Sequence, residues 1–135
     1  MPNPNISNIS SILGNTGYVI PSSAATATTS WTFNGTTSLT GLTPAANSVH
    51  KLNSITVANT TSSAATATIG VGNNATFGSA TVIAYPAFQI SVPPNATLII
   101  LDKTTPLYIT ENQSVAAFSG TASALTFTVS FEILT

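Results

Sequence analysis

Six side chains of this 135-residue chain could take part in acid–base or metal chemistry: His50, Lys51, Asp102, Lys103, Glu111 and Glu132. A glycosidase built from Asp102 and Glu111 would need both carboxylates to face one cleft across a hairpin. A metal site would have to combine His50 with carboxylates, but these residues follow no spacing typical of metal ligands. Neither kind of site is predicted.

Nucleophilic and phosphate chemistry also lacks its usual residues. Serine and threonine are abundant, but a hydroxyl nucleophile needs a base, and His50 is the single histidine. No nucleophile elbow, P-loop or dinucleotide fingerprint occurs. The absence of cysteine removes disulfides and thiolate metal sites. We therefore expect no enzymatic activity, no cofactor and no bound metal.

The remaining polar and aromatic candidates have structural interpretations. His50 and Lys51 begin an alternating segment, where we interpret them as a polar edge that discourages wrong strand pairing. Trp31 belongs to the alternating run Trp-Thr-Phe, which favours a place in the core over a ligand platform. The large aromatic side chains that could stack on a sugar are Tyr18, Trp31, Tyr85 and Tyr108.

Charge is the most informative feature of the composition. Charged residues make up 4% of the chain, against about 25% in an ordinary domain. With Lys51 and Lys103 as its only lysines and no arginine, the chain cannot neutralise a series of phosphates, so neither nucleic-acid nor polybasic membrane binding is expected. No window reaches 18 uninterrupted apolar residues, and the first 14 residues do not resemble a secretory signal. Charged residues normally keep a free protein from associating, so this low charge content favours a protein that is part of an assembly.

The elements are predicted to be short strands. Apolar residues at every second position between 125 and 133 alternate with threonine, serine and glutamate, which is typical of a half-buried strand. Glycine, asparagine and proline clusters separate such segments. We predict an all-β fold: a single β-sandwich, jelly-roll or immunoglobulin-like, with about eight to ten short antiparallel strands. The predicted strands lie near 17–20, 29–34, 49–59, 64–71, 80–84, 87–92, 96–102, 107–110, 114–119 and 124–134.

The beginning of the chain is predicted to be an arm. We place residues 1–24 in this arm, a short helix or an extended segment, and residues 25–135 in the sandwich. The helix would cover residues 5–14, where apolar residues fall at spacings of three and four. The arm could pack on its own domain or dock on a neighbouring subunit. The candidate interface residues are Ile6, Ile9, Leu13, Tyr18 and Tyr108.

Asparagine precedes serine or threonine by two positions at seven places. In a chain so rich in these residue types, chance produces most such patterns, and we do not predict glycosylation. The seven are Asn5, Asn8, Asn34, Asn59, Asn74, Asn95 and Asn112.

Three segments together resemble a known family. They are HKLNSITVANTTSSAATATIGV, VPPNATLIILDKTTPLYITENQSV and ALTFTVSFEIL, and they span roughly residues 49–134. They are similar to small virion structural proteins of tailed bacteriophages, particularly those that infect cyanobacteria. The run DK-xx-P-LY-I-x-E is the distinctive part. The closing Ser130 to Ile133 departs from the family pattern, which often has two acidic residues there.

The resemblance implies a β-sandwich component of a phage particle without enzymatic activity. It implies a cement or decoration protein on the outside of the head, bound to the major capsid protein or another virion protein, and forming a homo-oligomer such as a trimer. A structural protein of the tail, neck or baseplate is the alternative. A host-glycan-binding adhesion module is a third hypothesis, from a different class.

Overall fold

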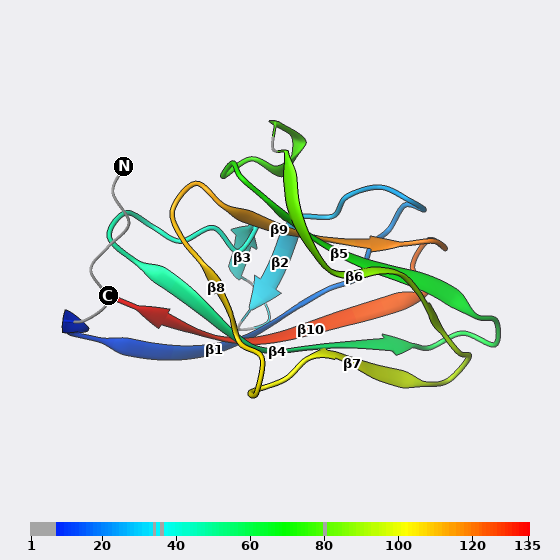
Figure 1. The fold of residues 1–135 in the computed structure, drawn as a ribbon. Coiled ribbons are helices and arrows are strands. Elements are labelled where there is room, and N and C mark those ends of the chain that lie inside the picture. The colour runs from blue at the N-terminus through cyan, green and yellow to red at the C-terminus, as the bar shows by residue number, and fades with distance from the viewer. Residues whose placement is uncertain (1–7, 34, 36, 80) are drawn as a thin grey trace.

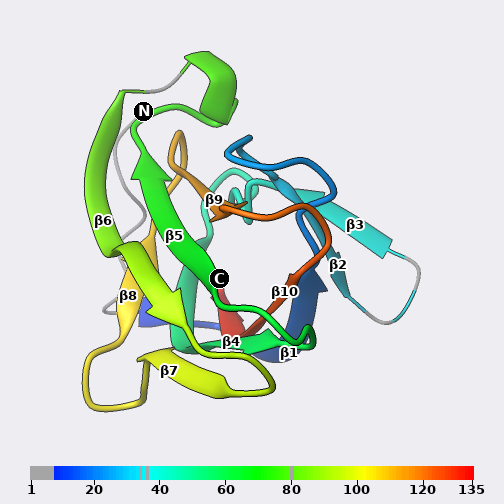
Figure 2. The same cartoon turned by 90° about the vertical axis from the view of Figure 1, so that its right-hand side faces the viewer.

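A computed structural model of the chain describes residues 8–33, 35, 37–79 and 81–135. It confirms the predicted all-β class, because its strands form two antiparallel sheets that lie one above the other as a sandwich (Figure 1). In an end-on view, β6, β5 and β9 lie over β4, β10 and β1 (Figure 2).

The larger sheet has seven strands. Their order is β3-β2-β1-β10-β4-β7. The last edge of β4 is shared by two strands, because β7 pairs with its second half and β8 with its first half. The long strands β10 and β4 form its centre, so nearly every strand of this sheet depends on partners distant in sequence. The bounds are β1 Ile12–Val19, β2 Ser30–Phe33, β3 Thr37–Thr40, β4 Val49–Asn59, β7 Thr97–Leu101, β8 Leu107–Ile109 and β10 Leu125–Leu134.

The smaller sheet has three strands in the order β6-β5-β9, namely β6 Val82–Val92, β5 Ala65–Gly72 and β9 Ser114–Ser119. A short 3-10 helix, η2 Phe77–Ser79, lies in the connection from β5 to β6. An isolated bridge between Thr28 and Ala117 ties the segment before β2 to β9 and so links the two sheets.

The core lies between the sheets and follows the alternation of the sequence. Along β10 Leu125, Phe127, Val129 and Phe131 are buried, and the threonines and serine between them are half-buried on the outer face. Because side chains of a strand alternate between faces, one face of each strand supplies the core. The largest fully buried side chains are Trp31, Phe127, Phe131, Leu42, Leu52, Ile55, Ile69, Ile109 and Leu125.

The outer face of the larger sheet explains the abundance of threonine. In one row across the sheet, Thr56, Thr128, Tyr18 and Thr32 are direct partners on β4, β10, β1 and β2. Threonine suits such positions because its β-branch favours an extended chain while its hydroxyl remains in water. The face therefore stays polar although it carries few charges.

The segment predicted as an arm contains a strand of the larger sheet. Within residues 1–24, β1 pairs with β10 along its whole length and with β2 on its other edge. Of the two predicted alternatives, a helix over 5–14 or an extended segment, the helix is wrong for residues 12–14, which are extended because pairing with β10 outweighs the local helical spacing. Residues 1–7, including Ile6, lie outside the described part of the chain.

The strand predictions are otherwise close to the structure, with two differences. Thr37–Thr40 forms a strand, β3, that was not predicted; it pairs with β2 across a turn in which Gly35 has a φ of 77°. The strands predicted at 80–84 and 87–92 are one irregular strand, β6, which continues through Pro86. Proline is tolerated there because β6 is an edge strand.

Candidate functional site

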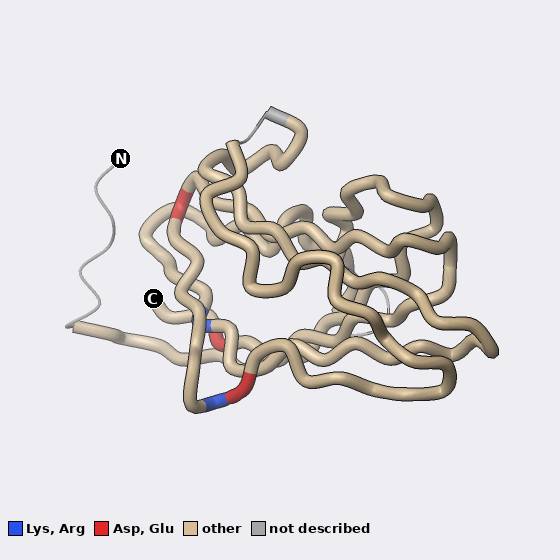
Figure 3. Tube along the Cα trace, turned by 45° about the vertical axis from the view of Figure 1, so that its right-hand side comes forward, with Lys and Arg blue, Asp and Glu red and all other residues tan. Residues whose placement is uncertain are grey.

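Two of the three acidic residues, Asp102 and Glu111, lie in turns, and the third, Glu132, lies in β10. Asp102 and Glu111 lie on either side of β8, one in the turn before it and one in the turn after it. Figure 3 shows how sparse the charged positions are along the trace. No group of three or more potential metal-ligating side chains occurs in the described ranges.

Asp102 and Glu111 both accept hydrogen bonds from backbone amides. Asp102 Oδ1 accepts from Thr104 N at 2.9 Å and from the Thr104 hydroxyl, and these bonds lower the pKa of the carboxyl below 3.8. Glu111 Oε1 accepts from Asn47 N at 2.6 Å. The Asp102 carboxylate therefore holds the bend beside it, whereas Glu111 ties its own turn to the distant loop that contains Asn47.

His50 is buried, which corrects its interpretation as a polar strand edge. It lies in β4 with β10 on one side and β8 on the other. Its Nδ1 is 2.6 Å from Leu42 O, and its ring centroid is 5.3 Å from that of Phe131. A ring nitrogen that faces a carbonyl oxygen carries the proton, so the neutral tautomer is protonated on Nδ1. Burial lowers the pKa of His50 and outweighs the hydrogen bond to Leu42, which raises it.

Acidification is expected to destabilise the fold through His50. Because its folded-state pKa lies below 6.5, the unfolded chain binds the proton more readily. The stability that neutral His50 contributes is therefore complete above that value and falls as the pH drops from 6.5 toward the folded-state pKa. Asp102 titrates below 3.8 and so contributes little over this interval. Urea unfolding at about pH 7.5 and about pH 5 measures the difference.

The control for this prediction is His50→Asn. Asparagine keeps a donor nitrogen close to the position of Nδ1 but does not titrate in this range. The variant should lose most of the difference in unfolding free energy between the two pH values. A difference as large as that of the native chain would show that another group is responsible.

The four candidate interface residues that the structure describes do not form one patch. Ile9 and Leu13 are 40% and 58% exposed near the beginning of β1. Tyr18 and Tyr108 are also exposed, but β10 and β4 separate the strands on which they lie. Trp31 is fully buried and its Nε1 donates to Val115 O at 3.0 Å, in agreement with the predicted core position.

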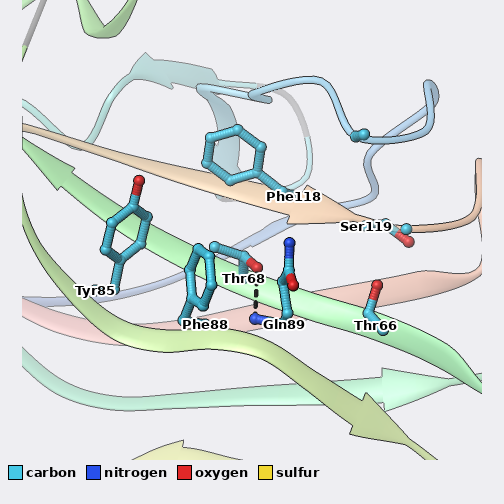
Figure 4. Close-up of a pocket in the computed structure, with 9 residues that line it drawn as sticks. Thr66, Thr68, Tyr85, Phe88, Gln89, Phe118 and Ser119 are labelled. Atoms are coloured by element: carbon cyan, nitrogen blue, oxygen red, sulfur yellow. Dashed lines mark hydrogen bonds between the residues drawn. The ribbon is translucent and has the colours of Figure 1, made fainter.

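The hollow with the clearest ligand-like lining lies on the small sheet, where sequence reasoning had singled out Tyr85 alone. The rings of Tyr85 and Phe88 meet edge to face with centroids 4.9 Å apart, and Phe118 of β9 lies across from them (Figure 4). Side chains three positions apart on a regular strand point to opposite faces. The contact between Tyr85 and Phe88 therefore requires an irregular strand.

The irregularity is a series of register shifts between β5 and β6. At one of them Thr68 of β5 faces two residues of β6, Phe88 and Gln89, so both side chains lie on the outer face. Gln89 has a φ of 49°, in the left-handed region, and its backbone N donates to Thr68 Oγ1 at 2.9 Å. The bulge thus sets the direction of Phe88 and of the Gln89 side chain.

We call this site the aromatic hollow and define it by its lining residues. Its volume is about 220 Å³. Three rings stand at one end, and polar side chains and the Gln89 amide stand toward the other (Figure 4). None of its lining residues carries a charge. They are Ala25, Thr66, Thr68, Tyr85, Phe88, Gln89, Phe118, Ser119 and Gly120.

A second depression, larger at about 590 Å³ but more open to solvent, lies on the outer face of the larger sheet. It is lined by small residues of β1, β4 and β10, by Lys103 and Glu132, and by Phe131, whose ring is buried in the core. It contains no aromatic platform comparable with Tyr85 and Phe88. We therefore regard the aromatic hollow as the stronger candidate binding site.

The described residues contain no helix that is long and apolar enough to cross a membrane. Family models, curated proteins and solved structures were each compared with the chain, and no match was found in any of the three.

Proposed function

We propose that the protein is a non-enzymatic structural component of a phage virion, a cement or decoration protein that binds the outside of the assembled capsid. The proposal starts from the resemblance of residues 49–134 to virion proteins. Those segments contain β4, which has a central place in the larger sheet, and its neighbours β7, β8 and β10. A partner surface would be the major capsid protein or another virion protein.

The observation that supports this proposal best is the apolar beginning of β1. Ile12 and Leu13 are 63% and 58% exposed, and neighbouring residues of a strand point to opposite faces. Both faces of this end are therefore open, and Ile9 adds a third exposed apolar side chain beside them. Adjacent exposed apolar residues mark interaction sites, and a partner that covered both would have to contact both faces of this strand end.

The mechanism is stabilisation by mass action. A protein that binds only the assembled lattice lowers the free energy of that lattice by its own binding free energy. Many copies multiply the effect, and a symmetric oligomer such as a trimer would bind several capsid sites at once. An interface with few charges avoids the cost of burying unpaired ions.

Copy number distinguishes head from tail. Quantitative densitometry of purified virions is expected to give many copies per particle, as the head lattice requires. About a dozen copies or fewer would contradict the cement function and favour the tail, neck or baseplate, where rings of low symmetry number are usual.

The double variant Ile12→Ser, Leu13→Ser is expected to reduce incorporation into virions by more than about tenfold, because each buried side chain contributes about 1.5–3 kcal/mol. Both residues are exposed, so the free double variant should have nearly the same unfolding midpoint in urea as the native chain. Ile99→Ser is the control, since Ile99 is exposed on the outer face of β7. Native levels of the double variant in particles would contradict a role for this end of β1.

A further inference from the structure

The aromatic hollow is built at the place where the ladder between β5 and β6 is most irregular. Register shifts occur between Ala67 and Ile69, between Ile69 and Val71, and again next to Gly72. Each shift disrupts regular pairing of the two strands and twists β6 locally. The inward residues of β5 remain fully buried or nearly so. The irregularity therefore acts on the outer face, where it re-aims Tyr85, Phe88 and Gln89.

One strained backbone position lies at the same place, and among the described residues with positive φ other than glycine it is the one inside a strand. Gln89 has a φ of 49° inside a strand, a conformation that costs free energy for any residue other than glycine. Strained positions of this kind cluster at ligand sites. Here the strain places a side-chain amide next to Phe88 and within the hollow (Figure 4).

The side chains of the hollow combine aromatic rings with neutral hydrogen-bonding groups. Tyr85 and Phe88 are 49% and 58% exposed, so their rings are accessible to a ligand. The Gln89 amide offers a donor and an acceptor, and the hydroxyl of Thr66 offers both as well. The charged residues of the chain do not line it. A complementary ligand is therefore neutral, with an apolar C–H face for the rings and hydroxyl groups for the amide.

We infer that the aromatic hollow binds a neutral sugar ring, with Tyr85 and Phe88 as its stacking platform and Gln89 as its polar contact. A pyranose has the required pair of surfaces, an apolar face of C–H groups and an equatorial rim of hydroxyls. The volume of about 220 Å³ lies below the range of roughly 300–1,000 Å³ typical of larger ligands. The site therefore takes one ring, such as the terminal residue of a glycan.

A site that is exposed to solvent and holds a single ring binds weakly and depends on multivalency. Few contacts leave little free energy after the loss of translational and rotational freedom. Many copies on one particle would convert weak sites into strong attachment to a surface that displays the sugar. The sugar site and the apolar end of β1 use different residues, so each can fail without the other.

Saturation-transfer difference NMR with the full chain tests this inference. The probes are the methyl pyranosides of glucose, galactose, mannose, rhamnose and N-acetylglucosamine, each in millimolar excess. Transfer to the ring protons of at least one glycoside is expected. Phe88→Ala and Tyr85→Ala should each weaken binding by about tenfold or more. Absence of transfer to every glycoside would overturn the inference.

Two further variants separate binding from folding. Tyr108→Ala is the matched control, because Tyr108 is 46% exposed on the other sheet, against 49% for Tyr85; it should bind as the native chain does. Gln89→Gly should unfold at nearly the same temperature as the native chain, since glycine adopts positive φ without strain. It should nevertheless lose most of its affinity for the glycoside. Equal losses in Tyr108→Ala, or native affinity in Phe88→Ala, would contradict the site. Concentration-dependent dimerisation that Phe88→Ala abolishes would assign the hollow to a second copy instead.

Discussion

Replacement of Trp31 by alanine is expected to lower the free energy of unfolding by about 3–5 kcal/mol, as large-to-small changes of buried aromatic residues do. Trp31 lies in the short strand β2 and is fully buried. Its indole Nε1 donates to Val115 O of β9 at 3.0 Å, so the side chain joins the two sheets by packing and by a hydrogen bond. Alanine would leave a cavity between the sheets and remove that donor.

Urea unfolding followed by circular dichroism measures this change, because the single tryptophan is lost as a fluorescence probe. Trp31→Phe should lower the free energy of unfolding by less, because it keeps an aromatic ring in the core, although it also loses the donor to Val115 O. The control Tyr108→Ala, at an exposed position, should stay within about 0.5 kcal/mol of the native value. A Trp31→Ala variant as stable as this control would contradict the core position of the indole.

The buried position of Trp31 also changes how glycan-binding experiments should be interpreted. A fully buried indole cannot stack on a sugar, so any loss of binding in Trp31→Ala reports lost folding. The exposed rings of Tyr85 and Phe88 are the residues whose replacement reports on the ligand. Of these, the sequence alone pointed to Tyr85 as one of several scattered aromatic residues.

Most of the sandwich could be predicted because most strands keep the period of two. The alternation in β10 follows from one buried and one less buried face, which the sequence displays directly. Trp31 could be assigned to the core for the same reason. Where local pattern and tertiary environment agree, the element and its buried face both follow from the residues.

The failures occur where distant partners decide the structure. In β1 the residues ILGNTGYV include two glycines and one asparagine, which disfavour a strand locally, and the strand forms because β10 pairs with all of it. The His50 side chain is buried against Leu42 and Phe131, and these contacts have no local signal in the sequence. The bulge at Phe88 and Gln89 breaks the period of two, so the aromatic hollow could not be found from spacing. The proline in the middle of β6 was the one local sign of irregularity.

The structural role of Asn59 could not be predicted from the sequence. In the sequence it appears only within an Asn-x-Thr pattern. In the structure its side chain is buried at the end of β4 and makes four hydrogen bonds. Nδ2 donates to Ser63 O at 2.8 Å and to Val92 O at 3.0 Å, while Oδ1 accepts from the backbone N and the hydroxyl of Thr61. The amide therefore holds the turn from β4 to β5 and fastens it to the end of β6.

Asn59→Ala is expected to lower the free energy of unfolding by about 3 kcal/mol, because each lost hydrogen bond contributes about 1 kcal/mol and buried carbonyl groups lose their donor. Asn59→Asp, which has nearly the same shape, should be at least as unstable at neutral pH, since a carboxylate would face the oxygens of Ser63 and Val92. Asn53→Ala, at a half-buried position of the same strand, is the control and should change stability much less. Equal unfolding midpoints for Asn59→Ala and Asn53→Ala would show that the turn does not depend on this amide, whereas a stable Asn59→Asp beside an unstable Asn59→Ala would assign its contribution to packing and the Thr61 contacts alone.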